Sequence, residues 1–471
     1  MLTKILIANR GEIAVRIVRA CAEMNIRSVA IYTEPDRHAL HVKRADEAHS
    51  VGEDPLAGYL DPRRLVNLAV ETGCDAIHPG YGFLSENSEL ARICDERGIT
   101  FIGPSAYVIA KMGDKTQARD SMIKAGVPVT PGSDGNLADL DEALSVASEI
   151  GYPVMLKATS GGGGRGIRRC DSAEELRSQY PRVISEATKA FGSAEVFLEK
   201  CIVDPRHIEV QVLADREGNA IHLYERDCSI QRRNQKLIEI APSPQLTPEQ
   251  RQYVGELAVR AAKAVGYENA GTVEFLVTGN EVYFMEMNTR VQVEHTITEQ
   301  ITGVDIVREQ IRIAAGLPLT YRQEDISYRG YALQFRINAE DPKNNFLPSF
   351  GRITRYYAPG GPGVRTDTAI YTGYTIPPFY DSMCLKLVVW ALNWEDALDR
   401  GARALADMRV QGVKTTASYY QAILQNPDFR SGEFNTGFVP SHPELLNYSD
   451  KRDPSEVALA IAAAIAAYAG L

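Results

Sequence analysis

A run of glycines between two short segments is the feature that most constrains the fold of this chain. Five of the seven residues at 160–166 are glycine, with Arg165 among them and Lys157 just before them. The apolar segment 154–156 and the segment 167–169 predict two strands, which makes the glycines the tip of a hairpin. Glycine backbone adopts otherwise strained angles and brings several N–H groups close to a ligand, so this tip is suited to a polyphosphate.

Other interpretations of the glycine run can be weighed from the sequence. It is not a Walker A loop, because Gly166 is followed by Ile167 rather than by Lys and Ser or Thr. The spacing of Gly161, Gly163 and Gly166 matches the dinucleotide fingerprint, but a strand follows where that motif needs a helix. A flexible hairpin tip without a ligand is the remaining alternative, and the glycines alone do not exclude it.

The composition restricts the partners of the chain. A length of 471 residues suffices for roughly three domains. The net charge of −10 argues against a nucleic-acid or membrane-surface partner, which requires a basic surface. The seven cysteines include no CxxC pair and the first residues form no signal-peptide h-region, so we expect a cytoplasmic protein. No window is long and apolar enough to predict a membrane span.

Residues 1–112 predict a Rossmann-like domain. Short apolar strands alternate with helices there, beginning with a strand at 5–8 and a helix after Gly11. Alternating β and α elements form a parallel, doubly wound sheet whose ligand-binding loops follow the carboxyl ends of the strands. We therefore expect the loops 9–12 and 78–87 to lie at the same edge of this sheet.

Three segments follow this domain. Residues 113–316 predict a second domain, in which a piece hinged by Pro and Gly at about 131–203 is suited to a lid over bound phosphates. Residues 330–445 mix strands and helices and predict a third, α+β domain. The extension 446–471 contains a short Ala-rich helix with an apolar stripe, which either packs on its own body or docks on a partner subunit.

Two carboxylates in apolar strands predict a metal site. Glu274 lies in the segment 271–277 and Glu286 in the segment 282–288, and a buried carboxylate requires a partner charge or a metal. A three-residue turn at 279–281 puts the two carboxylates opposite each other on one face, whereas a two-residue turn puts them on opposite faces. Facing carboxylates suit a cation such as Mg²⁺ beside nucleotide phosphates, and separate salt bridges are the alternative.

A polar alternation follows the second of these strands. Arg290, Gln292 and Glu294 alternate with other residues, which predicts that the strand continues and that the three side chains project together near the metal. A cation beside a carboxylate can bind a small anion and deprotonate it, and a structural ion pair is the alternative. The same period of two puts His207 and Glu209 on one face of an earlier strand.

Seven motifs, taken in order, resemble those of the biotin carboxylase family. They are residues 7–14, 78–87, 112–115, the glycine run, 225–233, 286–295 and 336–342. The resemblance covers about residues 1–445. It implies an ATP-grasp fold, α/β and α+β, in which nucleotide lies between two α+β pieces, with an N-terminal doubly wound domain and a C-terminal α+β domain.

The resemblance implies an ATP-dependent ligase. Members of the family use MgATP and bicarbonate to carboxylate biotin on a separate carrier, through carboxyphosphate. The implied cofactors are ATP and Mg²⁺ or Mn²⁺, with two ions, and biotin enters as a carrier-bound substrate. The sequence contains no Met-Lys-Met attachment motif, so we do not expect biotin to be attached to this chain.

The resemblance also implies which residues form the site. ATP would contact Lys115, Lys157, Gly161, Gly162, Gly163, Gly164, Gly166, Glu199, Lys200, Ile202, His207, Gln231, Asn234, Glu274, Leu276 and Glu286. Metal would be held by Glu274, Glu286 and Asn288, and bicarbonate by Lys236, Arg290, Gln292, Val293 and Glu294. Biotin would contact Tyr81, Gly82, Arg336 and Asp381. The catalytic groups would be Lys236, Arg290, Glu294, which takes the proton of bicarbonate, and Arg336, which stabilises the biotin enolate.

Three residues narrow the assignment within the family. Asn234 stands where the family usually has His, which removes a titratable ring beside the nucleotide. Thr296 and Ile240 look more like pyruvate carboxylase than the acetyl-CoA enzyme. We therefore expect a homodimeric biotin carboxylase subunit of a two-subunit pyruvate carboxylase, whose other subunit carries biotin and the carboxyltransferase. The alternatives are a component of an acetyl-CoA or acyl-CoA carboxylase, another ATP-grasp carboxylate–amine ligase, and a nucleotide-binding regulatory subunit.

Overall fold

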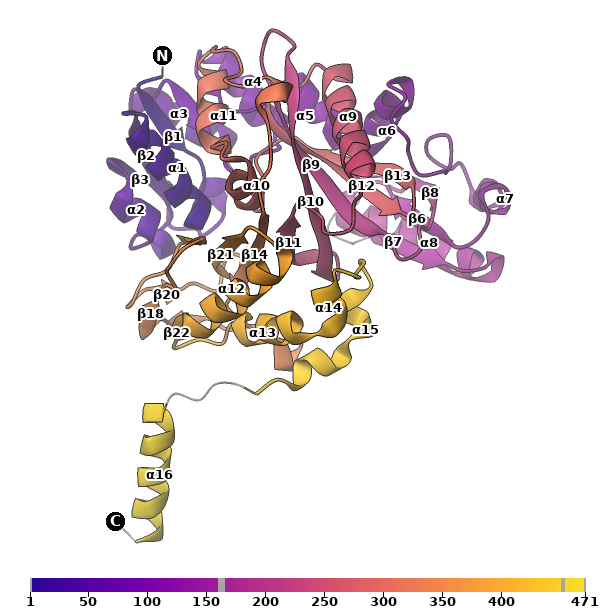
Figure 1. The fold of residues 1–471 in the computed structure, drawn as a ribbon. Helices are drawn as coiled ribbons and strands as arrows, with labels where there is room; N and C mark the ends of the chain where they lie inside the picture. The colour runs from indigo at the N-terminus through magenta and orange to yellow at the C-terminus, as the bar shows by residue number, and fades with distance from the viewer. Residues whose placement is uncertain (1, 160–165, 450–453, 470–471) are drawn as a thin grey trace.

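The structure is a computed structural model that describes residues 2–159, 166–449 and 454–469. A five-stranded parallel sheet opens the chain, with strand order β3-β2-β1-β4-β5. β1, β2 and β3 lie at the left of Figure 1. Its strands are β1 (Lys4–Ile7), β2 (Arg27–Tyr32), β3 (Glu47–Ser50), β4 (Ala76–His78) and β5 (Thr100–Phe101).

Helices cover both faces of this sheet. Ile5 and Ile7 of β1 pack in one core with α1 (Gly11–Glu23), whereas Leu6 packs in the opposite core with α3 (Pro62–Glu71) and α4 (Ser88–Glu96). Alternate residues of β1 thus pack against helices on opposite faces of the sheet, which confirms the predicted doubly wound arrangement. The remaining helices here are α2 (Leu40–Arg44), α5 (Ala106–Gly113) and α6 (Lys115–Lys124).

The two loops predicted at one sheet edge do meet there. The side-chain N–H group of Asn9 donates to the carbonyl oxygens of Pro79 and Tyr81, at 2.8 and 2.7 Å. This contact joins the loop after β1 to the loop after β4, and the position of both loops is confirmed.

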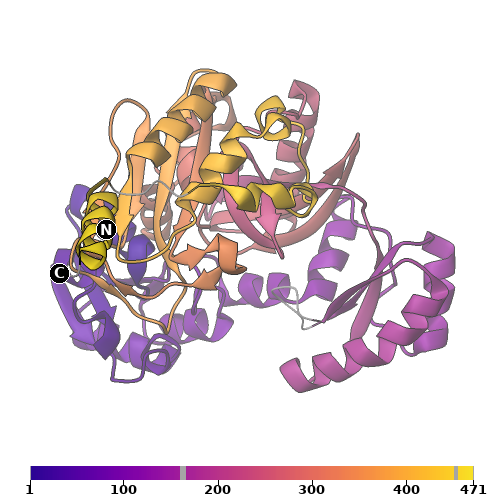
Figure 2. The ribbon, with the colours of Figure 1, turned by 90° about the horizontal axis from the view of Figure 1, so that it is seen from below.

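A small three-stranded sheet carries the predicted hairpin. β6 (Val154–Ala158) lies between β7 (Ile167–Cys170) and β8 (Val196–Lys200), and Lys157 pairs with Ile167 across the antiparallel hairpin. The helices α7 (Leu140–Ile150) and α8 (Ala173–Phe191) belong to this piece, which stands to one side of the molecule (Figure 2). Four of the five glycines, 161–164, lie outside the described residues.

An antiparallel sheet of eight strands forms the centre of the molecule, in the order β13-β12-β9-β10-β11-β14-β21-β19. The strands are β9 (Arg206–Ala214), β10 (Ala220–Arg232), β11 (Gln235–Ala241), β12 (Asn269–Thr278), β13 (Glu281–Asn288), β14 (Tyr331–Asn338), β19 (Val364–Thr368) and β21 (Met383–Ala391). β11 pairs directly with β14, so one sheet continues across the predicted boundary between the second and third domains.

Helices and short strands complete this central part. The helices are α9 (Pro248–Ala264), which begins with the capping box of Thr247 and Gln250, α10 (His295–Thr302), α11 (Ile306–Ala314), α12 (Trp394–Asp407), α13 (Ala417–Gln425), α14 (Pro427–Ser431) and α15 (Phe438–Ser441). The short strands are β15 (Glu340–Asp341), β16 (Leu347–Pro348), β17 (Gly351–Arg352), β18 (Arg355–Tyr357), β20 (Thr375–Ile376) and β22 (Arg409–Gln411).

The hairpin of β12 and β13 reaches the predicted pairing by a different route. Glu274 lies opposite Glu286, as predicted, but the turn contains two residues rather than three, because Thr278 pairs with Glu281. The predicted turn is therefore wrong. A β-bulge between Glu274 and Phe275 adds one residue on the partner strand and restores the two carboxylates to one face.

The C-terminal helix α16 (Pro454–Tyr468) stands away from the rest of the chain (Figure 1). Leu459, Ile461, Ile465 and Tyr468 are all exposed, by 54% to 96% of their surface. Of the two alternatives predicted for this helix, packing on its own body is therefore not observed, because the described apolar side chains are left uncovered. Within the described residues, no helix has the length and apolar character needed to cross a membrane.

Candidate active site

A cavity of about 1150 Å³ lies between the small sheet, the large sheet and the N-terminal loops. The predicted site residues that line it are Tyr81, Gly82, Lys115, Lys157, Glu199, Lys200, Ile202, His207, Gln231, Asn234, Lys236, Glu274, Leu276, Glu286, Asn288, Arg290, Gln292, Val293, Glu294, Arg336 and Asp381. Among the described site residues, Gly166 alone is not part of this lining. Predicted site residues from separate stretches of the sequence, between Tyr81 and Asp381, thus share one cavity.

The large sheet forms one wall of this cavity, here called the inner wall. Lys236, on β11, lies on this wall. Its Nζ contacts Glu274 at 3.0 Å and Glu294 at 2.7 Å, and it also donates to Glu209. Burial alone would lower the pKa of this amine, but the three carboxylates outweigh it and raise the pKa well above its usual value. The amine is therefore a permanent cation shared among three anions.

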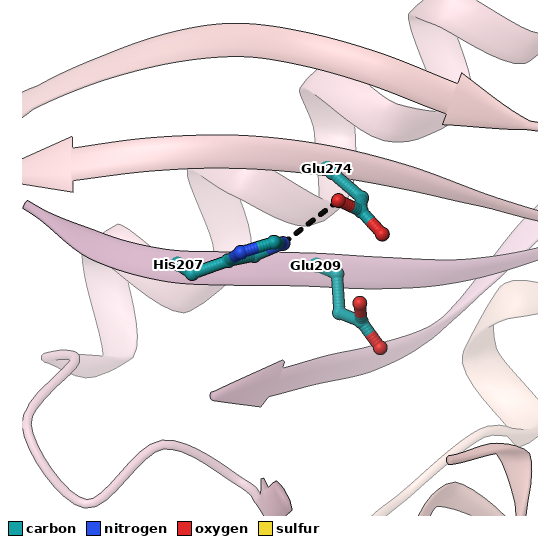
Figure 3. A group of neighbouring side chains, drawn as sticks. All are labelled: His207, Glu209 and Glu274. Carbon is teal, nitrogen blue, oxygen red and sulfur yellow. Dashed lines mark hydrogen bonds and ion pairs between the residues drawn. The ribbon is translucent and has the colours of Figure 1, made fainter. Parts of the chain in front are cut away.

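Both carboxylate oxygens of Glu274 have hydrogen-bond partners. One carboxylate oxygen lies 2.8 Å from Nε2 of His207 (Figure 3), and the other accepts from the amides of Asn288 and Gln292 at 3.0 and 2.7 Å. Burial would raise the pKa of Glu274, but Lys236 and His207 lower it well below its usual value. Glu274 therefore forms the salt bridges that were the alternative to a metal site, with Lys236 and His207.

Glu286 faces Glu274 with fewer contacts. Its Oε1 lies 3.5 Å from the side-chain amide of Asn288. Glu286 is exposed and lines the cavity, and the negative charge of Glu274 raises its pKa, a shift that Lys115 and Lys236 oppose only in part. Two facing carboxylates are hard oxygen donors, and a cation between them would relieve this repulsion, so Glu274 and Glu286 fit a divalent metal such as Mg²⁺. Asn288 turns its amide N–H group to both carboxylates, and its carbonyl oxygen accepts from Arg290.

His207, Glu209 and Glu274 also lie close enough together to form a candidate metal group (Figure 3). Glu209, however, is bound by two cations, because one of its oxygens accepts from Arg226 and the other from Lys236. Both oxygens of Glu209 are therefore occupied by cations, whereas the Asn288 amide approaches Glu286 no closer than 3.5 Å, so the facing pair of Glu274 and Glu286 leaves more room for a metal ion.

Arg226 lies within the motif 225–233, but it was assigned no role in the site from the sequence. Its guanidinium is fully buried and donates to Glu209, to Gln211 at 2.8 Å and to Gln292 at 2.7 Å. It therefore fixes the orientation of Gln292 from behind the cavity. The alternating polar face of residues 207–211 was the available signal, because such a face in a buried strand requires a cation opposite it.

The segment of Arg290, Gln292 and Glu294 is a turn and not the predicted continuation of the strand. β13 ends at Asn288, and the side chains converge on the cavity by separate contacts. Arg290 donates to Glu86 at 2.9 Å and to Asn288 at 2.7 Å. The prediction of a strand was wrong here because alternation over so few residues also fits an irregular turn.

Arg336 and Glu294 form the part of the inner wall nearest the third domain. Arg336 donates to Glu294 at 3.1 Å and also to Glu239. Burial would raise the pKa of Glu294, but Lys236, Arg336 and Arg226 together lower it below its usual range. The carboxylate is ionised and is held between two cations.

The outer wall of the cavity comes from the small sheet and α6. Lys157 pairs with Glu199, and Nη1 of Arg119 lies 3.7 Å from the same carboxylate. Burial lowers the pKa of Lys115, which stands at the start of α6. The amine of Lys200 donates to the carbonyl oxygens of Gly151 and Tyr152 at 2.9 and 3.0 Å.

The third side of the cavity holds the residues predicted to contact biotin. The hydroxyl of Tyr81 donates to Glu12, which lies in the first turn of α1. Asp381 accepts from the backbone N–H group of Met383 at 2.9 Å. Gly82 has a φ of +68°, which a glycine adopts without strain.

Three family models match consecutive parts of the chain between residues 1 and 441. The model described as biotin carboxylase, N-terminal domain, matches residues 1–109, and that described as carbamoyl-phosphate synthase L chain, ATP binding domain, matches residues 114–322. The model of the biotin carboxylase C-terminal domain matches residues 334–441. The chain belongs to the biotin carboxylase family. It is a biotin carboxylase subunit of a biotin-dependent carboxylase, and thus an ATP-dependent ligase.

Several relatives of this biotin carboxylase are more than half identical to it. The 2-oxoglutarate carboxylase small subunit of Hydrogenobacter thermophilus is 57% identical over 473 residues, which cover 100% of both chains. Biotin carboxylase 1 of Bacillus subtilis is 53% identical, over 94% of this chain and 99% of the relative. A pyruvate carboxylase subunit of Methanothermobacter thermautotrophicus is 53% identical, over 94% of this chain and 90% of the relative.

Solved structures share the fold of this biotin carboxylase. The biotin carboxylase domain dimer of the Hydrogenobacter thermophilus 2-oxoglutarate carboxylase, in complex with MgADP, ADP and bicarbonate, matches with a TM-score of 0.93 and 57% identity, over 96% of this chain and 100% of that one. The biotin carboxylase subunit of a pyruvate carboxylase matches with a TM-score of 0.84 and 56% identity, over the same shares of both chains. The ATP-grasp architecture predicted from the motifs is confirmed.

Proposed function

We propose that this biotin carboxylase serves a two-subunit carboxylase whose final acceptor is a 2-oxo acid. The relatives that support this are the small subunit of a 2-oxoglutarate carboxylase and one subunit of a pyruvate carboxylase. Pyruvate, the acceptor expected from Thr296 and Ile240, and 2-oxoglutarate are the two candidates. The similarity to a Bacillus biotin carboxylase makes an acyl-CoA carboxylase the alternative.

The arrangement that carries the proposed chemistry is Lys236 between three carboxylates. An anion that enters beside Lys236 and Arg290 competes with those carboxylates for the amine. When bicarbonate takes the amine, Glu294 loses the cation that lowers its pKa most, so its basicity rises where the proton must be removed. Gln292 and the backbone of Val293 complete the bicarbonate contacts.

Glu294 takes the proton of bicarbonate in the proposed first step. The resulting oxyanion attacks the γ-phosphorus of ATP, the bond to the β-phosphate oxygen breaks, and carboxyphosphate and ADP form. Carboxyphosphate gives CO₂ and phosphate, and the phosphate removes the N1′ proton of biotin. Arg336 stabilises the biotin enolate, because a fixed cation in a water-poor site stabilises a developing oxyanion. Tyr81, Gly82 and Asp381 contact biotin.

The nucleotide is proposed to lie between the two walls of the cavity. Lys115, Lys157 and the glycine run hold its phosphates, and the apolar side chains of Ile202 and Leu276 line the wall near Glu199, Lys200, His207, Gln231 and Asn234. Glu274, Glu286 and Asn288 would hold Mg²⁺ or Mn²⁺, as one or two ions. Such an ion neutralises phosphate charge when bound.

The test of this function is ATP cleavage that depends on bicarbonate and is stimulated by biotin. Glu294→Gln removes the base and Arg336→Ala removes the enolate partner, and we expect each to lower this activity by about 100-fold or more. Activity of Glu294→Gln equal to that of the wild type would overturn the assignment of the base. Purification of the native complex and assay of pyruvate, 2-oxoglutarate and acetyl-CoA then identify the acceptor.

The proposed partner is a second polypeptide that carries biotin and the carboxyltransferase, joined to a homodimer of this chain in the cytoplasm. The full-length match to a carboxylase small subunit supports the partner, a dimeric homologue supports the homodimer, and seven free cysteines support the compartment. We place the exposed helix α16 at the contact with that partner. Removal of residues 446–471 should leave activity with free biotin unchanged and abolish co-purification of the partner.

A further inference from the structure

Glu12 and Lys386 form a buried ion pair beside the cavity, and none of the roles above uses it. Lys386 lies on β21 and is fully buried, and Glu12 lies in the first turn of α1 and is 3% exposed. Nζ and Oε2 of the two side chains are 3.0 Å apart. Burying two opposite charges is costly unless further hydrogen bonds satisfy them, so the additional bonds of this pair indicate what it holds in place.

Each partner of the pair binds one piece of the cavity wall. The amine of Lys386 donates to the carbonyl oxygen of Val293 at 3.0 Å. The second oxygen of Glu12 accepts the hydroxyl of Tyr81. Val293 and Tyr81 both line the cavity, the first on the bicarbonate side and the second on the biotin side. One ion pair therefore connects the two substrate regions.

The carbonyl group before Val293 is anchored in a similar way. Nδ1 of the buried His295 lies 2.8 Å from the carbonyl oxygen of Gln292. In a trans peptide the N–H group points away from the C=O group, so two carbonyl oxygens anchored in the interior direct the N–H groups of Val293 and Glu294 to the other side. The orientation of this backbone thus depends on His295 and Lys386.

The sheet register places Lys386 next to the catalytic machinery. β14 and β21 pair Arg336 with Lys386, so both side chains leave the same face of the sheet. Arg336 reaches the carboxylate of Glu294 at 3.1 Å, while Lys386 reaches the carbonyl oxygen of Val293, one residue earlier. Neighbouring cations therefore hold the side chain and the backbone of the same turn.

We propose that Glu12 and Lys386 are positioning residues, which set the backbone of Val293 and Glu294 for bicarbonate and hold Tyr81 on the biotin side. The pair connects four parts of the chain, α1, the loop after β4, β21 and the turn before α10. This inference rests on the proposed function of the cavity. One buried ion pair then aligns the sites of bicarbonate and biotin, which react one after the other.

The first test is Lys386→Met, which keeps the length of the side chain and removes the amine. We expect kcat/KM for bicarbonate to fall by about 10- to 100-fold, as for a small misplacement of binding groups, with the KM for ATP within about twofold of the wild type. An equal fall in kcat/KM for bicarbonate and for ATP would contradict the proposal, and so would unchanged bicarbonate kinetics.

A matched control separates positioning from folding. Arg251→Met breaks another buried ion pair, with Glu225 at 2.8 Å, which joins α9 to β10 away from the cavity. It should lower Tm and leave the KM for bicarbonate unchanged. The double variant Glu12→Gln/Lys386→Met removes both charges and should regain stability relative to Lys386→Met. If bicarbonate kinetics recovered together with stability, the pair would be only structural.

A parallel measurement distinguishes failure of this inference from failure of the proposed function. Glu294→Gln is assayed under the same conditions. Loss of turnover in Glu294→Gln together with wild-type bicarbonate kinetics in Lys386→Met overturns the role of the pair alone. Retained turnover in Glu294→Gln overturns the proposed function of the cavity itself.

Discussion

The two walls of the cavity hold their lysines differently. On the inner wall, Lys236 is 12% exposed and contacts three carboxylates that are at most 4% exposed. On the outer wall, Lys157 is 22% exposed and pairs with Glu199, which is 15% exposed. An amine shared by three buried anions is fixed by folding. An amine with one partly exposed partner can exchange that partner for a phosphate at little cost.

The difference indicates when each wall is completed. The inner wall exists before substrates bind, because its charges compensate one another within the large sheet. The outer wall includes the small sheet, where Lys157 pairs with Glu199, a partly exposed partner that a phosphate can replace. Catalysis in such a site combines a preorganised electrostatic surface with a surface that closes on the nucleotide.

Lys236→Met should have the largest effect and would break the inner wall. It leaves the carboxylates of Glu209, Glu274 and Glu294 without their common cation, so we expect a loss of about 3–5 kcal/mol in the free energy of unfolding. Bicarbonate-dependent ATP cleavage should fall by about 1000-fold or more. Denaturant unfolding and the ATPase assay measure the two effects.

Lys236→Arg is the control for this prediction. It keeps the charge but changes the geometry, so it should recover more stability than turnover. A Lys236→Met protein as stable as the wild type would show that the three carboxylates do not depend on this amine, and the contrast between the walls would be lost.

Lys157→Met tests the outer wall and should have an intermediate effect. We expect the KM for ATP to rise about 10- to 100-fold, as for the loss of one charged hydrogen bond, while the free energy of unfolding changes by less than about 1 kcal/mol. Arg169→Met is the matched control, because Arg169 lies on β7 of the same sheet, pairs with Asp171 and is half exposed. It should leave the KM for ATP unchanged.

The comparison of the walls also shows what the sequence could predict. The strands around the glycine run, the doubly wound sheet and the cavity-lining positions follow from local patterns and from the family motifs. The position of Arg226 does not, because its five partners come from four separate segments and meet only in the folded sheet. The alternating polar face of residues 207–211 indicates that a cation lies opposite it, but no local pattern indicates the partners in the other three segments.

The hairpin of Glu274 and Glu286 shows a second limit. Its turn length was predicted incorrectly, yet the carboxylates face each other, because a β-bulge compensates for the missing turn residue. A bulge has no reliable signal in a short apolar strand. The facing pair was predicted from a three-residue turn, whereas the structure reaches it through a two-residue turn and a bulge, which the sequence did not indicate.

Glu286→Gln should have the smallest effect of the three substitutions, measured as a change in Tm. It tests the position where the two walls meet. The charge of Glu274 raises the pKa of Glu286, whose side chain is exposed, so the folded protein binds more protons than the unfolded chain as the pH rises through this pKa. Stability contributed by the protonated form is therefore lost with rising pH. The neutral variant avoids this loss, and without metal its Tm at neutral pH should exceed that of the wild type by about 1–2 °C.

Mg²⁺ should reverse this order. A cation that binds the folded protein stabilises it in proportion to its affinity, and Glu286→Gln removes one of the three proposed ligands. We expect the wild type to gain more in Tm than the variant as Mg²⁺ is added, and the apparent affinity for Mg²⁺ to fall by about tenfold in the variant. Thermal unfolding at several pH values, with EDTA and with Mg²⁺, measures both effects. Equal responses of the two proteins to Mg²⁺ would mean that the facing carboxylates are not the metal site, and the border between the walls would then consist of ion pairs alone.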